Sequence, residues 1–272
     1  MKSLSQSIRS TTKWIWLGCG CGVLLSMIIF APASWLAQTL ASASTGHVLL
    51  QEPLGTVWSG SADLVLSGGD TSIGAVSLPS RLYWKIKPNW LGGLGLGLIL
   101  EAPCCTKAPM NIDLSIKEGR LAWALKDSRL TLPAELLAGL GAPWNTLQLA
   151  GELILESDHF AGLWSASQGL GSITGQATLQ ANRIETALST LKPLGNYRLM
   201  TTGTSLRLET TASDAALQLT GSGQMDGGRA HFQGEALAAP GREEALSNLL
   251  HIIGQWQPST DGRMRSLLKL GT

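Results

Sequence analysis

The residues of this chain best suited to chemistry are four cysteines. Cys19 and Cys21 lie in an apolar run, where we expect them to serve as small apolar side chains. Cys104 and Cys105 are adjacent, in the sequence APCCTKAP. In an oxidising compartment such a pair forms a vicinal disulfide or remains as two thiols. No histidine or aspartate lies close in sequence and zinc takes about four ligands, so we do not expect a metal site.

Other catalytic patterns are weak. Four histidines are scattered, and none forms an HExxH or HxH arrangement: His47, His159, His231 and His251. The sequence has no GxSxG nucleophile turn and no GxxxxGKS or GxxxxGKT phosphate loop, and no strand–helix unit surrounds the glycines at 92–97. The adjacent Glu243 and Glu244 fit the solvated start of a helix. We therefore predict a protein that is not an enzyme and has no catalytic, cofactor-binding or metal-binding residues.

Composition narrows the broad class. The chain has 20 basic and 19 acidic side chains, and a net charge of +1 argues against a nucleic-acid-binding protein, which would carry a basic stripe. Only 14% of the 272 residues are charged while 44% are hydrophobic, and 32 are glycine. This composition is typical of an envelope or extracytoplasmic β-protein rather than of a cytosolic enzyme.

A transmembrane helix is predicted near the N-terminus. Residues 14–33 contain no charged side chain, and a helix of this length reaches about 30 Å, the hydrocarbon thickness of a bilayer. Lys2, Arg9 and Lys13 precede the run, whereas no lysine or arginine follows it until Arg81. The positive-inside rule therefore places residues 1–13 in the cytoplasm and everything after the run across the membrane.

The side chains assigned to this anchor are apolar, with tryptophans at both boundaries: Trp14, Trp16, Leu24, Leu25, Ile28, Ile29 and Trp35. Indole rings favour the membrane–water interface, where the ring is buried and its N–H is hydrated. The alternative is a signal peptide cleaved near Ala41–Ala43, although its apolar core usually spans only about 7–15 residues. Either interpretation exports the remainder of the chain.

After the anchor we predict a periplasmic linker over residues 34–50 and a periplasmic β domain over residues 51–272. Apolar and polar residues alternate in short runs such as RLYWKIK, NIDLSIK and RLAWALK. This period is typical of antiparallel strands with one buried and one wet face. The expected fold is mainly β: an antiparallel, one-sided sheet, curled or barrel-like, with a few short helices. Two of these helices are predicted at residues 133–141 and 242–254.

Weak internal repetition suggests two repeated β-units, 51–157 and 158–272. The sequence GTVWSG at Gly55–Gly60 is loosely echoed by GLWSA at Gly162–Ala166. A DGG sequence at residues 226–228 predicts a hairpin turn. The glycine-rich run at residues 90–100 is apolar on both faces. It is either a second membrane-touching element or a central strand that another backbone approaches closely.

The GTVWSG sequence is the candidate structural or partner-binding motif. It comprises Gly55, Thr56, Val57, Trp58, Ser59 and Gly60. We expect a turn and the start of a strand, with Trp58 in the core and the two glycines bending the backbone beside its ring. The alternative is that Trp58 contacts a partner directly.

The two faces of the predicted sheet suggest different roles. Its polar face is rich in Thr, Ser, Gln and Asn, which suits contacts with other proteins or extension at an open sheet edge. Its apolar face is either a filled core or a groove for an acyl chain, and the sequence leaves both open. The functions that follow are an interaction subunit and, as the alternative, a periplasmic lipid-binding or lipid-handling protein with an apolar β groove.

The order of these motifs resembles the type II secretion system protein N family. A basic start and one anchor precede GTVWSG with its trailing ADLVL, and an LxWxI strand is followed by Pro88 and then Trp90–Leu91. Later matches are LGNYR, GSGQMDGGRAHFQGEA, EALSNLLHIIG, the GQWQP–DGR turn and the closing LLKL. The resemblance covers about residues 10–270. The cysteine pair and the glycine-rich stretch after Trp90 depart from it.

The resemblance implies a single-pass inner-membrane protein of a Gram-negative secretion machine, with a cytoplasmic N-terminus and a periplasmic C-terminal domain. That machine exports folded proteins from the periplasm across the outer membrane. The implied partners are inner-membrane platform proteins and the outer-membrane secretin, and the resemblance implies no catalysis and no cofactor.

Overall fold

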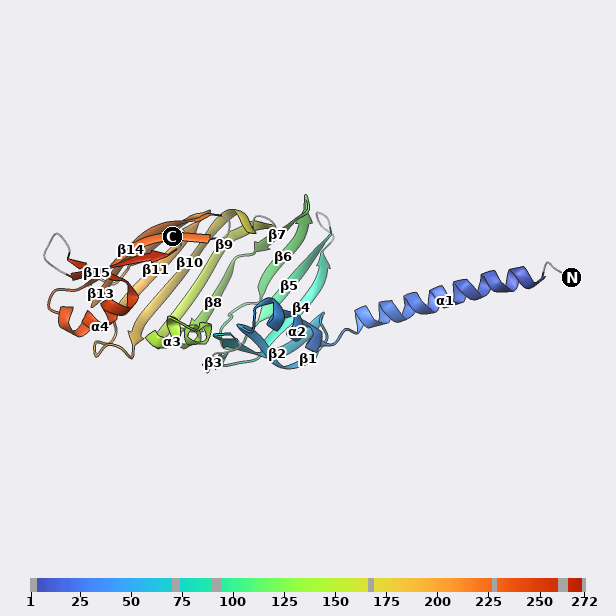
Figure 1. Ribbon diagram of the computed structural model, residues 1–272, viewed down its shortest axis with the longest axis horizontal. Coiled ribbons are helices and arrows are strands. Elements are labelled where there is room, and N and C mark those ends of the chain that lie inside the picture. Colours follow the sequence, from blue (N-terminus) through green and yellow to red (C-terminus); the bar gives the residue numbers. More distant parts are fainter. Residues whose placement is uncertain are drawn as a thin grey trace.

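The chain folds as one long helix joined to a domain built on a single curved sheet (Figure 1). The computed structural model describes residues 4–69, 74–89, 94–165, 169–226, 229–258 and 264–270. The helices are α1 (Leu4–Ile29), α2 (Ala33–Ala43), the 3-10 helix η1 (Ala134–Leu140), α3 (Trp144–Leu147) and α4 (Glu243–Ile253). None of the described helical residues forms a segment that is both long enough and apolar enough to cross a membrane.

The strands follow one another along most of the chain. Those before the first long strand are β1 (Val48–Gly55), β2 (Ser59–Ser67), β3 (Ala75–Ser77), β4 (Leu82–Asn89), β5 (Gly95–Glu101), β6 (Met110–Lys117), β7 (Arg120–Leu125) and β8 (Ser128–Pro133). The remainder are β9 (Leu149–Ser165), β10 (Gly169–Thr186), β11 (Gly195–Thr202), β12 (Ser205–Thr210), β13 (Leu217–Asp226), β14 (Arg229–Ala238), β15 (Gln255–Pro258) and β16 (Met264–Leu270).

All described strands belong to one antiparallel sheet. Its order is β1-β2-β4-β5-β6-β7-β9-β10-β11-β12-β13-β14-β16-β15, while β3 pairs with β2 and β8 pairs with β9. The predicted mainly β, antiparallel fold is confirmed. The sheet is open rather than barrel-like, because its order ends at β1 on one side and at β15 on the other. The predicted DGG hairpin falls between β13 and β14, but residues 227–228 lie outside the described residues.

The structure does not divide at the expected boundary between two repeated units. The boundary at residues 157 and 158 falls inside β9, a continuous strand of 17 residues that pairs along its length with β10. The two similar sequences also occupy different places. GTVWSG forms the turn that enters β2, whereas GLWSA begins within the last part of β9, near the end of the strand. The echo therefore does not mark equivalent positions in two copies of one unit.

Strand alternation places apolar side chains on one face of the sheet. Trp84 of β4 lies opposite Leu100 of β5, and Leu98 of β5 lies opposite Ile112 of β6. Directly opposed residues of antiparallel strands share a face, so these apolar side chains form one continuous surface across the strands. Polar residues such as Lys85 project from the other face.

Helices cover both ends of the apolar face. Under α2, the buried cluster contains Ala33, Leu50, Ala62 and Trp84. The predicted linker over residues 34–50 is thus mostly a helix packed on the sheet, since α2 occupies Ala33–Ala43 and β1 begins at Val48. At the far end, α4 lies where the sequence predicts a helix, and its buried residues Leu246, Leu249 and Leu250 pack against the ends of β13 and β14.

The predicted helix at residues 133–141 is the 3-10 helix η1. It is bounded by Pro133 and by Gly141, whose φ of 82° lies in the left-handed region that glycine tolerates. Leu136 of η1 is buried with Leu78, Ala102 and Cys105. This cluster holds the β2–β4 part of the sheet against η1 and β8.

The later part of the glycine-rich run at residues 90–100 forms a central strand, which was one of the two alternatives for this run; the other was a membrane-touching element. Residues 90–93 lie outside the described residues, and the rest of the run forms β5 between β4 and β6. A Cβ at Gly95 would lie 2.7 Å from the carbonyl oxygen of Leu114, so the neighbouring backbone approaches closely there. Leu94 and Leu96 remain exposed, so this end of the strand is not buried.

Candidate interaction surfaces

The GTVWSG sequence forms a tight turn between β1 and β2. The backbone N–H of Thr56 donates to the carbonyl oxygen of Ser59 at 2.9 Å, and the N–H of Ser59 donates back to Thr56 Oγ1 at 3.2 Å. Gly55 has a φ of +90°, and a Cβ on it would lie 2.6 Å from the carbonyl oxygen of Ser59. Glycine is therefore required where the turn begins.

This turn joins the sheet to the end of α1. The last carbonyl groups of a helix lack partners within the helix and must find them elsewhere. Trp58 Nε1 donates to the carbonyl oxygen of Ile28 at 2.7 Å, and the N–H of Val57 donates to that of Ala31 at 2.9 Å. Within the described chain, these bonds tie the last turn of α1 and the residues just after it to the sheet, so we call residues 55–60 the joint.

The predicted core position of Trp58 is wrong, and another tryptophan fills the core. Trp58 is half-buried beside α1, whereas Trp84 of β4 is only 4% exposed. Trp84 Nε1 donates to the carbonyl oxygen of Val57 at 3.0 Å. A Cβ at Gly60 would lie 2.5 Å from the Trp84 ring. Gly60 thus makes room for the ring of Trp84 rather than for that of Trp58.

The predicted anchor residues fall on two helices. Trp14, Trp16, Leu24, Leu25, Ile28 and Ile29 lie in α1, and the side chain of Trp14 is outside the described residues. The other five of these side chains are exposed. Trp35 lies in the first turn of α2, where its side chain is also exposed.

Cys104 and Cys105 are joined by a disulfide in a turn that lies against β8. The N–H of Thr131 in β8 donates to the carbonyl oxygen of Cys105 at 2.8 Å, and the N–H of Cys104 donates to Ser80 Oγ at 3.2 Å. Cys105 is buried in the cluster with Leu136, whereas Cys104 is exposed. The disulfide-bonded turn therefore covers the side of β8 that does not pair with β9.

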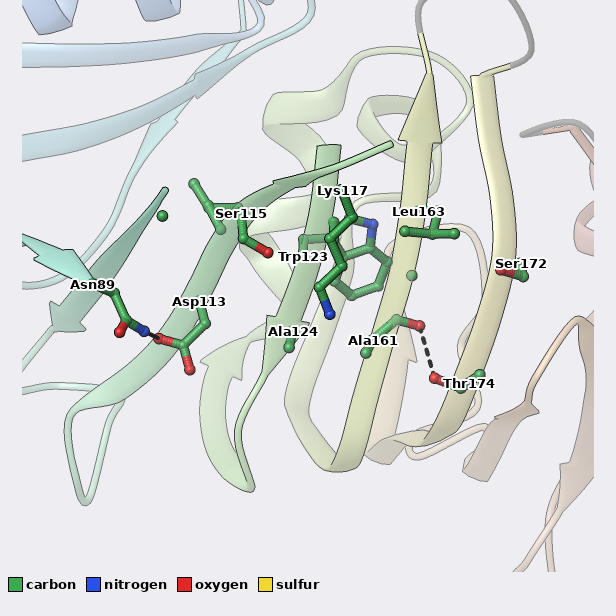
Figure 2. A pocket seen from close by; sticks show the side chains of 14 residues that line it. Asn89, Asp113, Ser115, Lys117, Trp123, Ala124, Ala161, Leu163, Ser172 and Thr174 are labelled. Carbon is green, nitrogen blue, oxygen red and sulfur yellow. Dashed lines mark hydrogen bonds between the residues drawn. The ribbon is translucent and has the colours of Figure 1, made fainter. Parts of the chain in front are cut away.

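A recess of about 440 Å³ lies on the polar face over β5–β10, as Figure 2 shows. Cross-strand register explains the hollow, because small residues lie close together on this face: Gly95, Ala122, Ala124 and Ala161. Larger polar side chains surround them, including Asp113, Lys117 and Thr174.

Hydrogen bonds and charges around the recess are ordinary surface ones. Asn89 Nδ2 donates to Asp113 Oδ1 at 3.3 Å, and Lys126 Nζ lies 3.2 Å from Asp113 Oδ2. Asp113 is therefore held as an ion pair at the rim. A recess with these groups can accept and donate hydrogen bonds to a polar partner, and the lining contains no histidine or cysteine that would act as a base or nucleophile.

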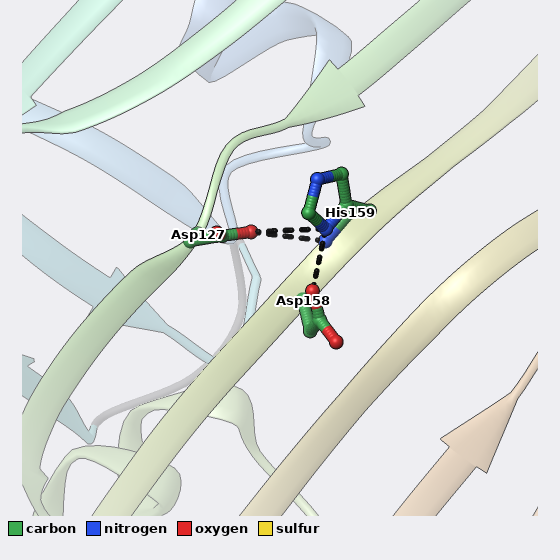
Figure 3. A group of neighbouring side chains, drawn as sticks. All are labelled: Asp127, Asp158 and His159. Carbon is green, nitrogen blue, oxygen red and sulfur yellow. Dashed lines mark hydrogen bonds and ion pairs between the residues drawn. The ribbon is translucent and has the colours of Figure 1, made fainter.

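One group of ligand-type atoms is brought together by the fold and not by sequence spacing. Asp127, Asp158 and His159 offer oxygen and nitrogen atoms that lie within 4.8 Å of one another (Figure 3). Asp127 follows β7, while Asp158 and His159 lie at a kink in β9, where His159 has a φ of 46°. His159 Nδ1 is 2.5 Å from Asp158 Oδ1 and 3.5 Å from Asp127 Oδ1.

Electrostatics at this group follow from the two carboxylates. The hydrogen bond to Asp158, and then the charges of Asp127 and Asp158, raise the pKa of His159 above its usual value. All three side chains are exposed, so solvent screens the pair. The group could not be predicted from the sequence because Asp127 is distant in sequence from the other two residues, and only Asp158 and His159 are adjacent.

The contrasting titratable group is buried. Tyr197 donates its hydroxyl hydrogen to the carbonyl oxygen of Leu217 at 2.9 Å, and burial raises its pKa above the usual value. Its neighbours are apolar, including Leu153 and Ile184. Tyr197 is thus a neutral, hydrogen-bonded core residue.

Comparison with known proteins gives one match. A family model described as type II secretion system (T2SS), protein N matches residues 46–266, which span the joint and nearly the whole sheet. No curated protein and no solved structure matches the chain.

Proposed function

The chain belongs to the type II secretion system protein N family, and on that premise we propose how it contributes to secretion. We propose that it is a non-enzymatic, single-pass inner-membrane component whose periplasmic sheet supports export of folded proteins across the outer membrane. It does so by contacting inner-membrane platform proteins, the secretin, or both. The observation that carries this proposal is the joint, which fastens an apolar helix to a broad, one-sided sheet.

Support for the anchor comes from the surface of α1. Its exposed side chains from Val23 to Phe30 are mostly large and apolar, which is unfavourable in water and favourable in lipid. The indole of Trp58 and the N–H of Val57 bind carbonyl oxygens where α1 ends. In this proposal the apolar residues 14–33, which comprise the later part of α1 and the residues just after it, cross the inner membrane with the N-terminus in the cytoplasm. The joint then holds the sheet close to the periplasmic surface.

Support for action by contact comes from the polar face. The recess over β5–β10 has hydrogen-bonding groups, among them Ser172 and Thr174, but no activated nucleophile among its lining residues. The histidine with a raised pKa, His159, is fully exposed and paired with carboxylates. Catalytic acids and bases are usually shifted by burial in a cleft, so this surface suits binding better than proton transfer.

A deletion strain tests the proposal. Loss of the chain should strand an exported hydrolase in the periplasm, and the full-length chain should restore its export. A photo-reactive residue at Ser172, on the recess, should then crosslink to another secretion component in living cells. The matched control is a photo-reactive residue at Thr39, which is exposed on the opposite, helix-covered side of the domain. Normal export without the chain would disprove the proposed function.

A second candidate function is retention of lipid on the apolar face. The observation that favours it is that α2 and α4 pack at the two ends of this face, while side chains such as Leu96 and Leu121 between them are exposed. Native mass spectrometry of the full chain in detergent distinguishes the two. A retained phospholipid in stoichiometric amount supports lipid handling, and a protein mass without lipid contradicts it.

A further inference from the structure

Four exposed apolar side chains form a row across the ends of neighbouring strands. Leu94 precedes β5, Ile116 lies near the end of β6, Leu121 near the start of β7 and Trp164 near the end of β9. Their exposed fractions are 74%, 66%, 37% and 45%, in the same order. Most other apolar side chains of this face are half-buried or buried, so the exposure is concentrated at one end of the strands.

Register shows that the row is contiguous. Ile116 lies opposite Leu121, and Leu121 lies opposite Trp164. The N–H of Ile116 donates to the carbonyl oxygen of Leu94 at 3.4 Å, one step beyond the Gly95–Ser115 pair. Directly opposed residues share a face of the sheet, so the four side chains are adjacent and project together. We call them the apolar row.

Helix cover does not reach the apolar row in the described part of the chain. The extensive contacts of α2 are with β1 and β2, those of α4 are with β14–β16, and those of η1 are with β2, β3, β9 and α3. A contiguous exposed apolar patch on a protein surface is typical of a site that a membrane, a ligand or another protein covers.

The position of α1 indicates that a membrane covers the apolar row. In Figure 1 the β4–β5 and β6–β7 ends of the strands lie at the upper edge of the domain, in the half from which α1 leaves. Because the joint ties α1 to the sheet, a bilayer crossed by α1 would lie against that side. The β6–β7 tip also carries Lys117 and Arg120 against a single anion, Glu118, which pairs with Arg120 at 3.0 Å. Tryptophan and basic residues beside apolar ones are typical of the surface of an anionic membrane.

We propose that the apolar row is a second membrane contact, which rests on the bilayer surface beside α1. The row inserts at the depth of the lipid headgroups, and α1 and the row together fix the orientation of the sheet above the membrane. This inference rests on the proposed function, because it requires that α1 is a membrane anchor.

Lipid photo-crosslinking of the full chain tests the inference. The protein is placed in nanodiscs of phosphatidylethanolamine and phosphatidylglycerol, with p-benzoylphenylalanine at one position at a time. The positions are Leu121 in the row, Leu25 in α1, and Tyr83, an exposed residue on the opposite face of β4. Far-ultraviolet circular dichroism of each variant shows whether the sheet is retained, and Tyr83 is the matched control because its surface exposure resembles that of the row.

We expect a mass shift of one phospholipid from Leu25 and from Leu121, and no shift from Tyr83. A lipid adduct at Leu25 without one at Leu121 would overturn the membrane contact and leave the anchor intact. Adducts of equal yield at Leu121 and Tyr83 would also overturn it, because the contact would then be non-specific. No adduct at Leu25 would contradict both the inference and the inner-membrane part of the proposed function.

Discussion

Two tryptophans of the apolar face pack against the sheet in the same way but differ in how far they are buried. Trp84 lies opposite Gly60, and Trp123 lies opposite Gly162, so each ring lies over the backbone of a glycine on the next strand. Trp84 is buried under α2, whereas Trp123 is half-buried and contacts Phe160 edge-on at 5.3 Å.

The difference between the two pairs shows what a covering helix contributes. The local solution, a ring over a glycine, is set within the sheet and does not depend on the helix. What α2 adds is exclusion of water from the outer side of the ring, which makes one pair part of the core and leaves the other near the surface. The covered region around Trp84 therefore stabilises the fold, while the uncovered region around Trp123 is free to contact something else.

Truncation of the two rings should break the comparison most clearly. We expect Trp84→Ala to lower the free energy of unfolding by about 3–5 kcal/mol, because it leaves a cavity beneath α2. Trp123→Ala should cost about 1–2 kcal/mol, since its site is already partly exposed. Urea unfolding of the full chain in detergent, followed by far-ultraviolet circular dichroism, measures both. Equal losses would mean that α2 does not define the core.

Substitution of the two glycines tests the same contrast at the backbone. A Cβ at Gly60 would lie 2.5 Å from the backbone oxygen of Leu54 and from the Trp84 ring, and neither can move easily under α2. We expect Gly60→Ala to cost about 1–3 kcal/mol of unfolding free energy. For Gly162→Ala the three nearest atoms to the added Cβ all belong to the Trp123 ring, at 2.7 Å and beyond, and this half-buried ring can tilt outward. Its cost should be about 1 kcal/mol or less, and a larger loss at Gly162 than at Gly60 would contradict the comparison.

Removal of one indole donor sharpens the comparison at the joint. Trp58→Phe keeps an aromatic side chain but deletes the hydrogen bond to the carbonyl oxygen of Ile28, so we expect a loss of about 1 kcal/mol in the free energy of unfolding. Hydrogen exchange of the amides in the last turn of α1 should quicken. Trp164→Phe in the apolar row is the control. Its side chain is exposed and far from the joint, so the free energy of unfolding and the exchange rates in α1 should stay unchanged. Slow exchange in the Trp58 variant would show that the joint does not depend on that donor.

Titration of His159 and Tyr197 should show the smallest effect on stability. It distinguishes a pKa shifted by neighbouring charges from one shifted by burial. His159 in the uncovered region has a raised pKa because of Asp158 and Asp127, so its contribution to stability is present below about pH 6.5 and is lost as pH rises through the folded-state pKa. NMR titration should show that molar salt or Asp158→Asn moves this pKa back toward its usual value. The pKa of Tyr197, which lies in the buried cluster beside η1, is shifted by burial, so salt should leave it unchanged. A salt-insensitive His159 would contradict the assigned cause.

Much of the fold is visible in the sequence because burial of one sheet face imposes alternation. Periodicity in the sequence predicts the strands that contain Trp84, Ile112 and Trp123, and it also predicts the amphipathic helix α4. The helix α2 was missed although its signal is present: Ala33, Leu36, Ala37 and Leu40 fall at i, i+3, i+4 and i+7. The small, uncharged residues between them favoured the linker prediction.

The interaction surfaces were less predictable because they depend on contacts between distant residues. The GTVWSG turn was recognised, but the partner of Trp58 lies 30 residues earlier in the chain, so its role at the joint could not be predicted. The meeting of Asp127 with His159 requires the corner between β7 and β8 and the kink in β9. The apolar row needs the register of four strand ends, and alternation alone does not reveal which part of an apolar face a helix will cover.

The order of the strands has a consequence for how the polypeptide assembles. Nearly every strand up to β14 hydrogen-bonds to one made shortly before it, and only β16 and β15 exchange places at the end. Most strands therefore meet an edge already formed by an earlier strand, and after β1 only β8 and β15 among the described strands pair solely with a later one. Short-range pairing of this kind is kinetically favourable. Growth of the sheet is thus mostly sequential, and β16 must reach the edge of β14 before β15 can pair with it.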